Sequence, residues 1–117
     1  MNKKLHVLIV EDSEDDAELL LSELRSGGFE PLSERVDTRD AMADALNKKT
    51  WDVIISDYSM PHFNGLEALK LLGSSGLGIP CIIVSGKIGE DTAVQLMKAG
   101  ANDYVMKGNL KRLAAAI

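Results

Sequence analysis

The residues that decide the fold begin at Leu5 and read LHVLIVED, closing on the adjacent acids Glu11 and Asp12. Nearly continuous aliphatic and β-branched residues of this kind are typical of a strand that is covered on both faces. Two further runs of the same character occupy residues 53–55 (VII) and 81–84 (CIIV). The three runs predict buried strands, and the acids after the first run are expected at its carboxyl end.

Two weaker runs complete the set of predicted strands. Residues 29–36 mix charged and apolar side chains and contain Pro31. Because proline has no amide proton for the hydrogen-bond ladder, this strand is expected at an edge of the sheet. The fifth run is short and occupies residues 104–106 (YVM).

Segments with the apolar spacing of an amphipathic helix separate these strands. Asp37 or Thr38 is a possible cap of the second helix, and Asn64 precedes the third. A fifth helix is expected over residues 109–117, cut short after about two turns. The apolar positions expected to face the core are Ala17, Leu20, Leu21, Leu24, Met42, Ala45, Leu46, Leu66, Leu69, Leu72, Ala93, Leu96 and Met97.

Strands and helices therefore alternate strictly along the chain. This alternation predicts an α/β fold, in which a parallel sheet has right-handed crossovers and carries helices on both faces. A chain of 117 residues fits one domain, which is expected to span residues 1–117.

The amino-acid composition argues against several classes of protein. The chain is 45% hydrophobic and 26% charged, which argues against disorder, and its net charge of −5 disfavours a nucleic-acid or anionic-membrane partner. The single cysteine, Cys81, excludes an internal disulfide and suits a reducing compartment. No apolar run approaches the roughly 18 residues of a membrane span. We expect a cytoplasmic protein.

Polar residues follow four of the predicted strands directly. Each is ordinary by itself, since paired acids often occupy a helix N-terminus, a lone aspartate can form an Asx-turn, and most lysines are solvated. In a parallel sheet, however, all the carboxyl ends lie along one edge, where ligands bind. Their joint occurrence predicts a functional site made of Glu11, Asp12, Asp57, Ser85, Gly86 and Lys107.

The residue types at this edge indicate a chemistry. Three carboxylates placed together raise one another's pKa, and a divalent cation relieves the repulsion. Oxygen ligands of this kind suit Mg²⁺. A lysine, the Ser85 hydroxyl and the small Gly86 complement a phosphoryl group. Asp57 stands alone at its strand end and is the candidate nucleophile for an acyl phosphate, while Glu11 and Asp12 are better placed to hold the metal.

At these spacings the sequence resembles the receiver domain of two-component response regulators, over nearly the whole chain. Any one of the matching motifs is weak, whereas the set is specific. The motifs are Val10-Glu11-Asp12, Asp57-Tyr58-Ser59-Met60-Pro61, Gly65, Ser85-Gly86, Gly100-Ala101 and Asp103-Tyr104-Val105-Met106-Lys107.

The resemblance implies a flavodoxin-like, doubly wound, five-stranded parallel sheet with strand order 2-1-3-4-5. It implies that Asp57 accepts a phosphoryl group from a phosphohistidine of a histidine kinase or phosphotransfer protein, and that the domain then signals to a downstream effector domain or protein. Ser85 and Lys107 would contact the phosphoryl oxygens. The implied Mg²⁺ ligands are Glu11, Asp12, Asp57 and the main-chain carbonyl of Ser59.

The resemblance also implies a conformational switch. Tyr104 matches the aromatic residue that turns inward when Ser85 is drawn to the phosphoryl group, although a half-buried strand tyrosine is the plainer interpretation. The partner surface would then carry Lys87, Glu90, Asp91 and Lys98.

One departure from the family pattern follows the lysine. Gly108 stands where the family usually has a proline in a cis peptide bond, so we expect a trans bond and a more mobile turn. The short last helix suggests a receiver excised from a hybrid sensor kinase or a multidomain regulator, although a stand-alone regulator is also compatible with it.

Two alternatives remain at this stage. An aspartate-nucleophile phosphohydrolase uses the same ingredients, but such enzymes carry a second aspartate two residues after the nucleophile. Ser59 follows Asp57 at that distance and Glu14 follows Asp12, so neither aspartate fits. The other alternative is a receiver-like interaction module that is never phosphorylated.

Overall fold

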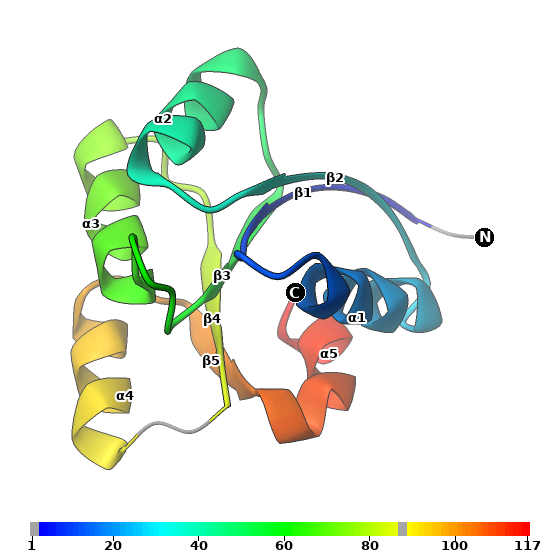
Figure 1. Ribbon diagram of the computed structural model, residues 1–117. Helices are drawn as coiled ribbons and strands as arrows, with labels where there is room; N and C mark the ends of the chain where they lie inside the picture. Colours follow the sequence, from blue (N-terminus) through cyan, green and yellow to red (C-terminus); the bar gives the residue numbers. More distant parts are fainter. Residues whose placement is uncertain (1–2, 87–88) are drawn as a thin grey trace.

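The computed structural model describes residues 3–86 and 89–117, and in this part a five-stranded parallel sheet carries helices on both faces (Figure 1). The strand order is β2-β1-β3-β4-β5, as predicted. The elements are β1 (Lys3–Val10), α1 (Glu14–Ser26), β2 (Phe29–Val36), α2 (Arg39–Lys48), β3 (Val53–Asp57), α3 (Gly65–Ser75), β4 (Cys81–Ser85), α4 (Glu90–Lys98), β5 (Asp103–Met106), a 3₁₀ segment η1 (Lys107–Arg112) and α5 (Leu113–Ala116).

The sheet separates two apolar layers. Along β1, Leu8 and Val10 pack into the layer under α2, α3 and α4, whereas Val7 and Ile9 pack into the layer under α1 and α5. Figure 1 shows the same division, with α1 and α5 on one side of the sheet and the other three helices on the opposite side. Because successive strand residues point to opposite faces, a continuous apolar run is what a doubly covered strand requires.

The edge position of β2 is also confirmed. Its neighbour is β1, and Pro31 lies opposite Leu5 in the parallel register. An edge strand has a neighbour on one side only, which is where proline is tolerated in a sheet.

Side-chain caps start three of the helices. Ser13 accepts a hydrogen bond from the amide of Asp16 at the start of α1, and Thr38, rather than Asp37, caps α2. Asn64 and Glu67 form a capping box at the start of α3. Such caps satisfy amide groups that the first helical turn leaves unpaired, and thereby fix where each helix begins beyond the sheet edge.

Three expectations need correction. Met97 is 44% exposed rather than buried, because the sheet-facing stripe of α4 is narrow and consists of Ala93 and Leu96. Leu66 is only partly buried, and Ala68 takes the fully buried position on α3. The third and largest difference concerns the helix predicted for the C-terminal residues of the chain.

The predicted helix over residues 109–117 is wrong in its first half. Residues 107–112 form the 3₁₀ segment η1, in which Asn109 has non-helical dihedral angles (φ −136°, ψ 45°), and α-helix begins only at Leu113. Leu113 is fully buried and anchors this short end against the layer under α1. The peptide bond before Gly108 is trans, as expected from the absence of proline. Within the described residues, no helix is long and apolar enough to cross a membrane.

Two glycines of α3 should respond oppositely to alanine. A Cβ at Gly65 would lie 3.0 Å from Tyr58 Cα and 3.1 Å from the carbonyl oxygen of Asp57, whereas one at Gly73 meets nothing within 4 Å. We expect Gly65→Ala to lower the free energy of unfolding by about 1–3 kcal/mol, since backbone atoms cannot rotate away. Gly73→Ala should raise it by about 0.5–1 kcal/mol, through helix propensity.

Urea unfolding of the two variants and the parent measures both effects. A Gly65→Ala variant that is as stable as the parent would show that α3 does not press against the β3 end as described.

Candidate functional site

An acidic cluster lies at the carboxyl edge of the sheet. Glu11, Asp12 and Asp57 each offer a carboxylate oxygen, and these three oxygens lie within 4.8 Å of one another. The register explains the meeting, because Val10 of β1 lies opposite Ser56 of β3, so the acids that follow each strand are neighbours. Glu11 and Asp57 are buried, and Asp12 is exposed.

Glu11 is held from two sides. Its Oε1 accepts a hydrogen bond of 3.1 Å from the amide of Ser13, and Arg35 Nη1 donates to its main-chain oxygen, also at 3.1 Å. Burial raises the pKa of Glu11 to about 7, with further raising by Asp12 and Asp57, against the lowering effect of the Ser13 amide. A buried carboxylate among other carboxylates favours proton uptake or a cation.

Lys107 brings the positive charge to this cluster. Its Nζ lies 3.6 Å from Asp57 Oδ2 and 3.2 Å from Asp16 Oδ2. Burial lowers the pKa of the ammonium, but Asp57, Asp16 and Glu11 together outweigh it, so the pKa is raised overall. The sequence prediction that residues from the ends of β1, β3 and β5 meet is confirmed for these side chains.

Ser85 and Gly86 lie at the end of β4, beside β3. Val84 lies opposite Asp57 in the register, and its carbonyl accepts a 3.0 Å hydrogen bond from Tyr58. Ser85 is buried. A Cβ at Gly86 would come no nearer than 4.0 Å to Lys107 Cδ, which is ordinary van der Waals contact, so the protein itself gives no steric reason for glycine there.

Ser59 lies two residues after Asp57, in the loop that follows β3. Its amide donates a hydrogen bond of 3.4 Å to Asp57 Oδ1, and the residue is exposed. The loop after β3 therefore folds its main chain back over the carboxylate, which places the neighbouring main-chain groups close to the acidic cluster.

Tyr104 lies on the other side of β5 from the α1 layer. It is half-buried, packs against the layer under α4, and lines a hollow of about 670 Å³ together with Glu90 and Lys98 of α4. Arg112 forms an ion pair with Asp103 and also donates to the main-chain carbonyl of Tyr104. Asp91, which also belongs to the predicted partner surface, is exposed on α4, whereas Lys87 lies outside the described residues.

Sequence reasoning missed two residues of this edge, Asp16 and Arg35. Asp16 sits in the first turn of α1 and looks like an ordinary helix N-terminal acid, and its ion pair joins positions 91 residues apart. Arg35 lies near the end of the edge strand β2. The parallel register places it beside Ile9, and this proximity to the acidic loop was the signal that could have identified it.

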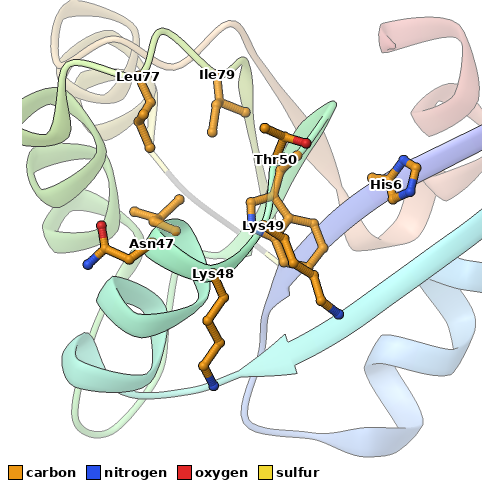
Figure 2. A pocket seen from close by; sticks show the side chains of 9 residues that line it. His6, Asn47, Lys48, Lys49, Thr50, Leu77 and Ile79 are labelled. Atoms are coloured by element: carbon orange, nitrogen blue, oxygen red, sulfur yellow. The ribbon is translucent and has the colours of Figure 1, made fainter.

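A second hollow, of about 730 Å³, lies at the opposite edge of the sheet (Figure 2). It is bordered by His6, Lys48, Lys49 and Trp51 and contains none of the three clustered acids. Trp51 Nε1 donates to the carbonyl of Ala45, and Lys49 lies 5.8 Å from the ring centre. These two contacts fix the indole of Trp51 against α2 and Lys49.

The chemistry of the acidic edge suits a hard divalent cation. Its donors are carboxylate oxygens, and no histidine or cysteine belongs to the cluster found among the described residues. Oxygen donors of this kind favour Mg²⁺ over softer metals. With Lys107 alongside, the site can also neutralise an anionic group held at Asp57. The chain is thus a doubly wound α/β domain with an acidic cluster at the carboxyl ends of its strands, the edge at which ligands bind in folds of this kind.

Comparison with known proteins gives the family. The chain belongs to the response regulator receiver domains, whose family model matches residues 7–117. The response regulator protein FleR of Pseudomonas aeruginosa is 33% identical over 101 residues, which cover 86% of this chain and 21% of FleR. This chain spans less than half the length of FleR and of the transcriptional regulators ZraR and PhoB.

Solved structures agree with the family. Full-length FixJ from B. japonicum superposes with a TM-score of 0.83 at 31% identity, covering 99% of this chain and 57% of FixJ. The Vibrio cholerae chemotaxis protein CheY4 gives a TM-score of 0.77 at 28% identity, covering 98% of this chain and 95% of CheY4. Both support the flavodoxin-like order predicted from the resemblance.

The acidic cluster predicts a stability response to Mg²⁺. A cation that binds only the folded chain should raise the free energy of unfolding by about 1.4 kcal/mol at ten times its dissociation constant. Asp57→Asn should lose most of this gain, because it removes one of the three clustered carboxylates. Urea unfolding with and without Mg²⁺ measures the difference.

Asp52→Asn is the matched control, since Asp52 pairs with His6 at the far edge of the sheet. This variant should keep the full Mg²⁺-dependent increment. An increment that is absent from the parent, or equal in both variants, would argue against a metal at the cluster.

Proposed function

We propose that this chain is a phosphoacceptor signalling domain, spanning residues 1–117, rather than an enzyme. The observation that carries the proposal is the convergence of Asp57 with two further carboxylates and the ammonium of Lys107 at one sheet edge. In this proposal Asp57 receives a phosphoryl group from the phosphohistidine of a partner histidine kinase or phosphotransfer protein.

The transfer step follows from the arrangement around Asp57. One Asp57 oxygen attacks the phosphorus atom, the phosphorus–nitrogen bond of the phosphohistidine breaks, and the departing imidazole takes up a proton. An acyl phosphate is left on Asp57. Lys107 and the Ser85 hydroxyl donate hydrogen bonds to the phosphoryl oxygens, and Gly86 leaves room beside them.

Glu11, Asp12, Asp57 and the main-chain carbonyl of Ser59 would hold Mg²⁺. The bound metal supplies charge neutralisation for the phosphoryl oxygens. Asp12 is exposed and so is accessible to a cation from solvent, whereas Glu11 is buried behind it. The hydrogen bond from the Ser59 amide to Asp57 orients the acceptor carboxylate.

Phosphorylation would be converted into a signal through Ser85 and Tyr104. A group with about two negative charges at Asp57 attracts the Ser85 hydroxyl at the end of β4. Displacement of Ser85 would leave space on the side of the neighbouring strand β5, and the ring of Tyr104 would turn inward. The surface formed by α4 and β5, including Glu90 and Lys98, would then change for a downstream effector domain or protein in the cytoplasm.

Phosphoryl uptake tests the proposal directly. Incubation with Mg²⁺ and a small acyl phosphate should add the mass of one phosphoryl group to the parent, and Asp57→Asn should remain unlabelled. Lys107→Ala should slow labelling by at least about tenfold, because an ammonium at the reacting group typically contributes more than about 1.4 kcal/mol. Intact-protein mass spectrometry follows the time course.

The control is again Asp52→Asn, which should label like the parent because it lies at the opposite edge. If Asp57→Asn labels as well as the parent, Asp57 is not the acceptor. A parent that never labels points to a receiver-like interaction module, and steady turnover of phosphomonoesters points to a phosphohydrolase.

A further inference from the structure

The ammonium of Lys107 is shared unequally between two carboxylates. It donates a hydrogen bond to Asp16 Oδ2 at 3.2 Å, whereas Asp57 Oδ2 lies 3.6 Å away, beyond hydrogen-bond range. Before any phosphoryl group arrives, Lys107 is therefore bonded to Asp16 and only electrostatically attracted to Asp57.

Asp16 is well fixed for this role. Its amide donates to Ser13 Oγ at 3.2 Å, and the amide of Ser13 donates in turn to Glu11 Oε1 at 3.1 Å. The start of α1 is thus tied to the same acidic loop that carries the candidate metal ligands. Asp16 has a short side chain, so the position of its carboxylate follows that of the helix.

The surroundings strengthen the ion pair. Asp16 and Lys107 border a small hollow of about 170 Å³ whose other walls are four apolar side chains and one carboxyl group: Leu19, Leu20, Val84, Leu110 and Glu11. Apolar walls reduce the screening of a partly buried charge pair relative to one surrounded by water. Both partners remain partly exposed, so the pair can still break when a stronger anion appears.

We propose that Asp16 is a positioning residue that holds the ammonium of Lys107 in a hydrogen bond and competes with the phosphoryl group for it. This inference rests on the proposed function. Lys107 has to exchange its hydrogen bond to Asp16 for one to a phosphoryl oxygen, and the Asp16 carboxylate also repels the incoming anion. Asp16 thereby sets how readily Asp57 is phosphorylated.

The experiment compares labelling rates with a small acyl phosphate and Mg²⁺. Asp16→Asn keeps an oxygen that accepts a hydrogen bond but removes the charge, so we expect labelling about two- to fivefold faster than in the parent. The gain should shrink as ionic strength rises. Asp16→Glu restores the charge and should label at nearly the parent rate.

Asp15→Asn is the matched control, because it removes the same charge from an adjacent, exposed position of the same helical turn. It should leave the labelling rate close to that of the parent. Labelling of Asp16→Asn that is no faster than that of Asp15→Asn would overturn the proposal, since a merely structural role for Asp16 predicts a loss and not a gain.

A measurement without phosphoryl transfer separates this inference from the proposed function. In a double-mutant cycle of urea unfolding, Asp16→Asn and Lys107→Gln should be non-additive by about two- to fivefold in the unfolding equilibrium constant. Asp15→Asn and Lys107→Gln should be additive. A parent that takes no phosphoryl group sinks the proposed function, and an additive Asp16–Lys107 cycle sinks this inference in either case.

Discussion

The parallel sheet imposes the constraint on which the rest of this structure depends. Because all five strands run in the same direction, every carboxyl end opens onto one edge, and residues from separate parts of the chain meet there. The register of β1 against β3 sets Glu11 and Asp12 beside Asp57, within 4.8 Å. The same topology delivers Lys107 from the end of β5. The apolar layers on both faces keep this register fixed, since a slip of one residue would turn every strand side chain to the other face.

The charge balance at this edge then explains its chemistry. Three carboxylates and one partly exposed ammonium leave the cluster with an excess of negative charge. Burial of Glu11 disfavours its ionised form, and the pKa of this carboxyl group is raised accordingly. A divalent cation supplies the two positive charges that three carboxylates and one ammonium leave unbalanced. The Asp16 carboxylate also forms an ion pair with the ammonium of Lys107. The carboxylates of Asp16 and Asp57 therefore both attract the single ammonium of Lys107.

Residues whose role depends on chain direction and periodicity were predictable from the sequence. The strand runs, the edge strand marked by Pro31 and the acids at the strand ends all follow from such local rules, and the structure confirms them. Features that depend on packing between distant elements were not predictable. Met97 fits the helical spacing but lies beside the narrow buried stripe of α4, and Asn109 interrupts a helix that composition alone would continue. The Asp16–Lys107 pair joins two surface-type residues, whose meeting depends on how η1 turns toward α1.

Chemical localisation of the acceptor tests the central claim most directly. An aspartyl phosphate is reduced by borohydride to homoserine, while an unmodified aspartate is not. After treatment with Mg²⁺ and a small acyl phosphate, tandem mass spectrometry of the reduced chain should find homoserine at position 57. Homoserine at position 12 instead, or at neither position in a chain that has gained phosphoryl mass, would contradict the account.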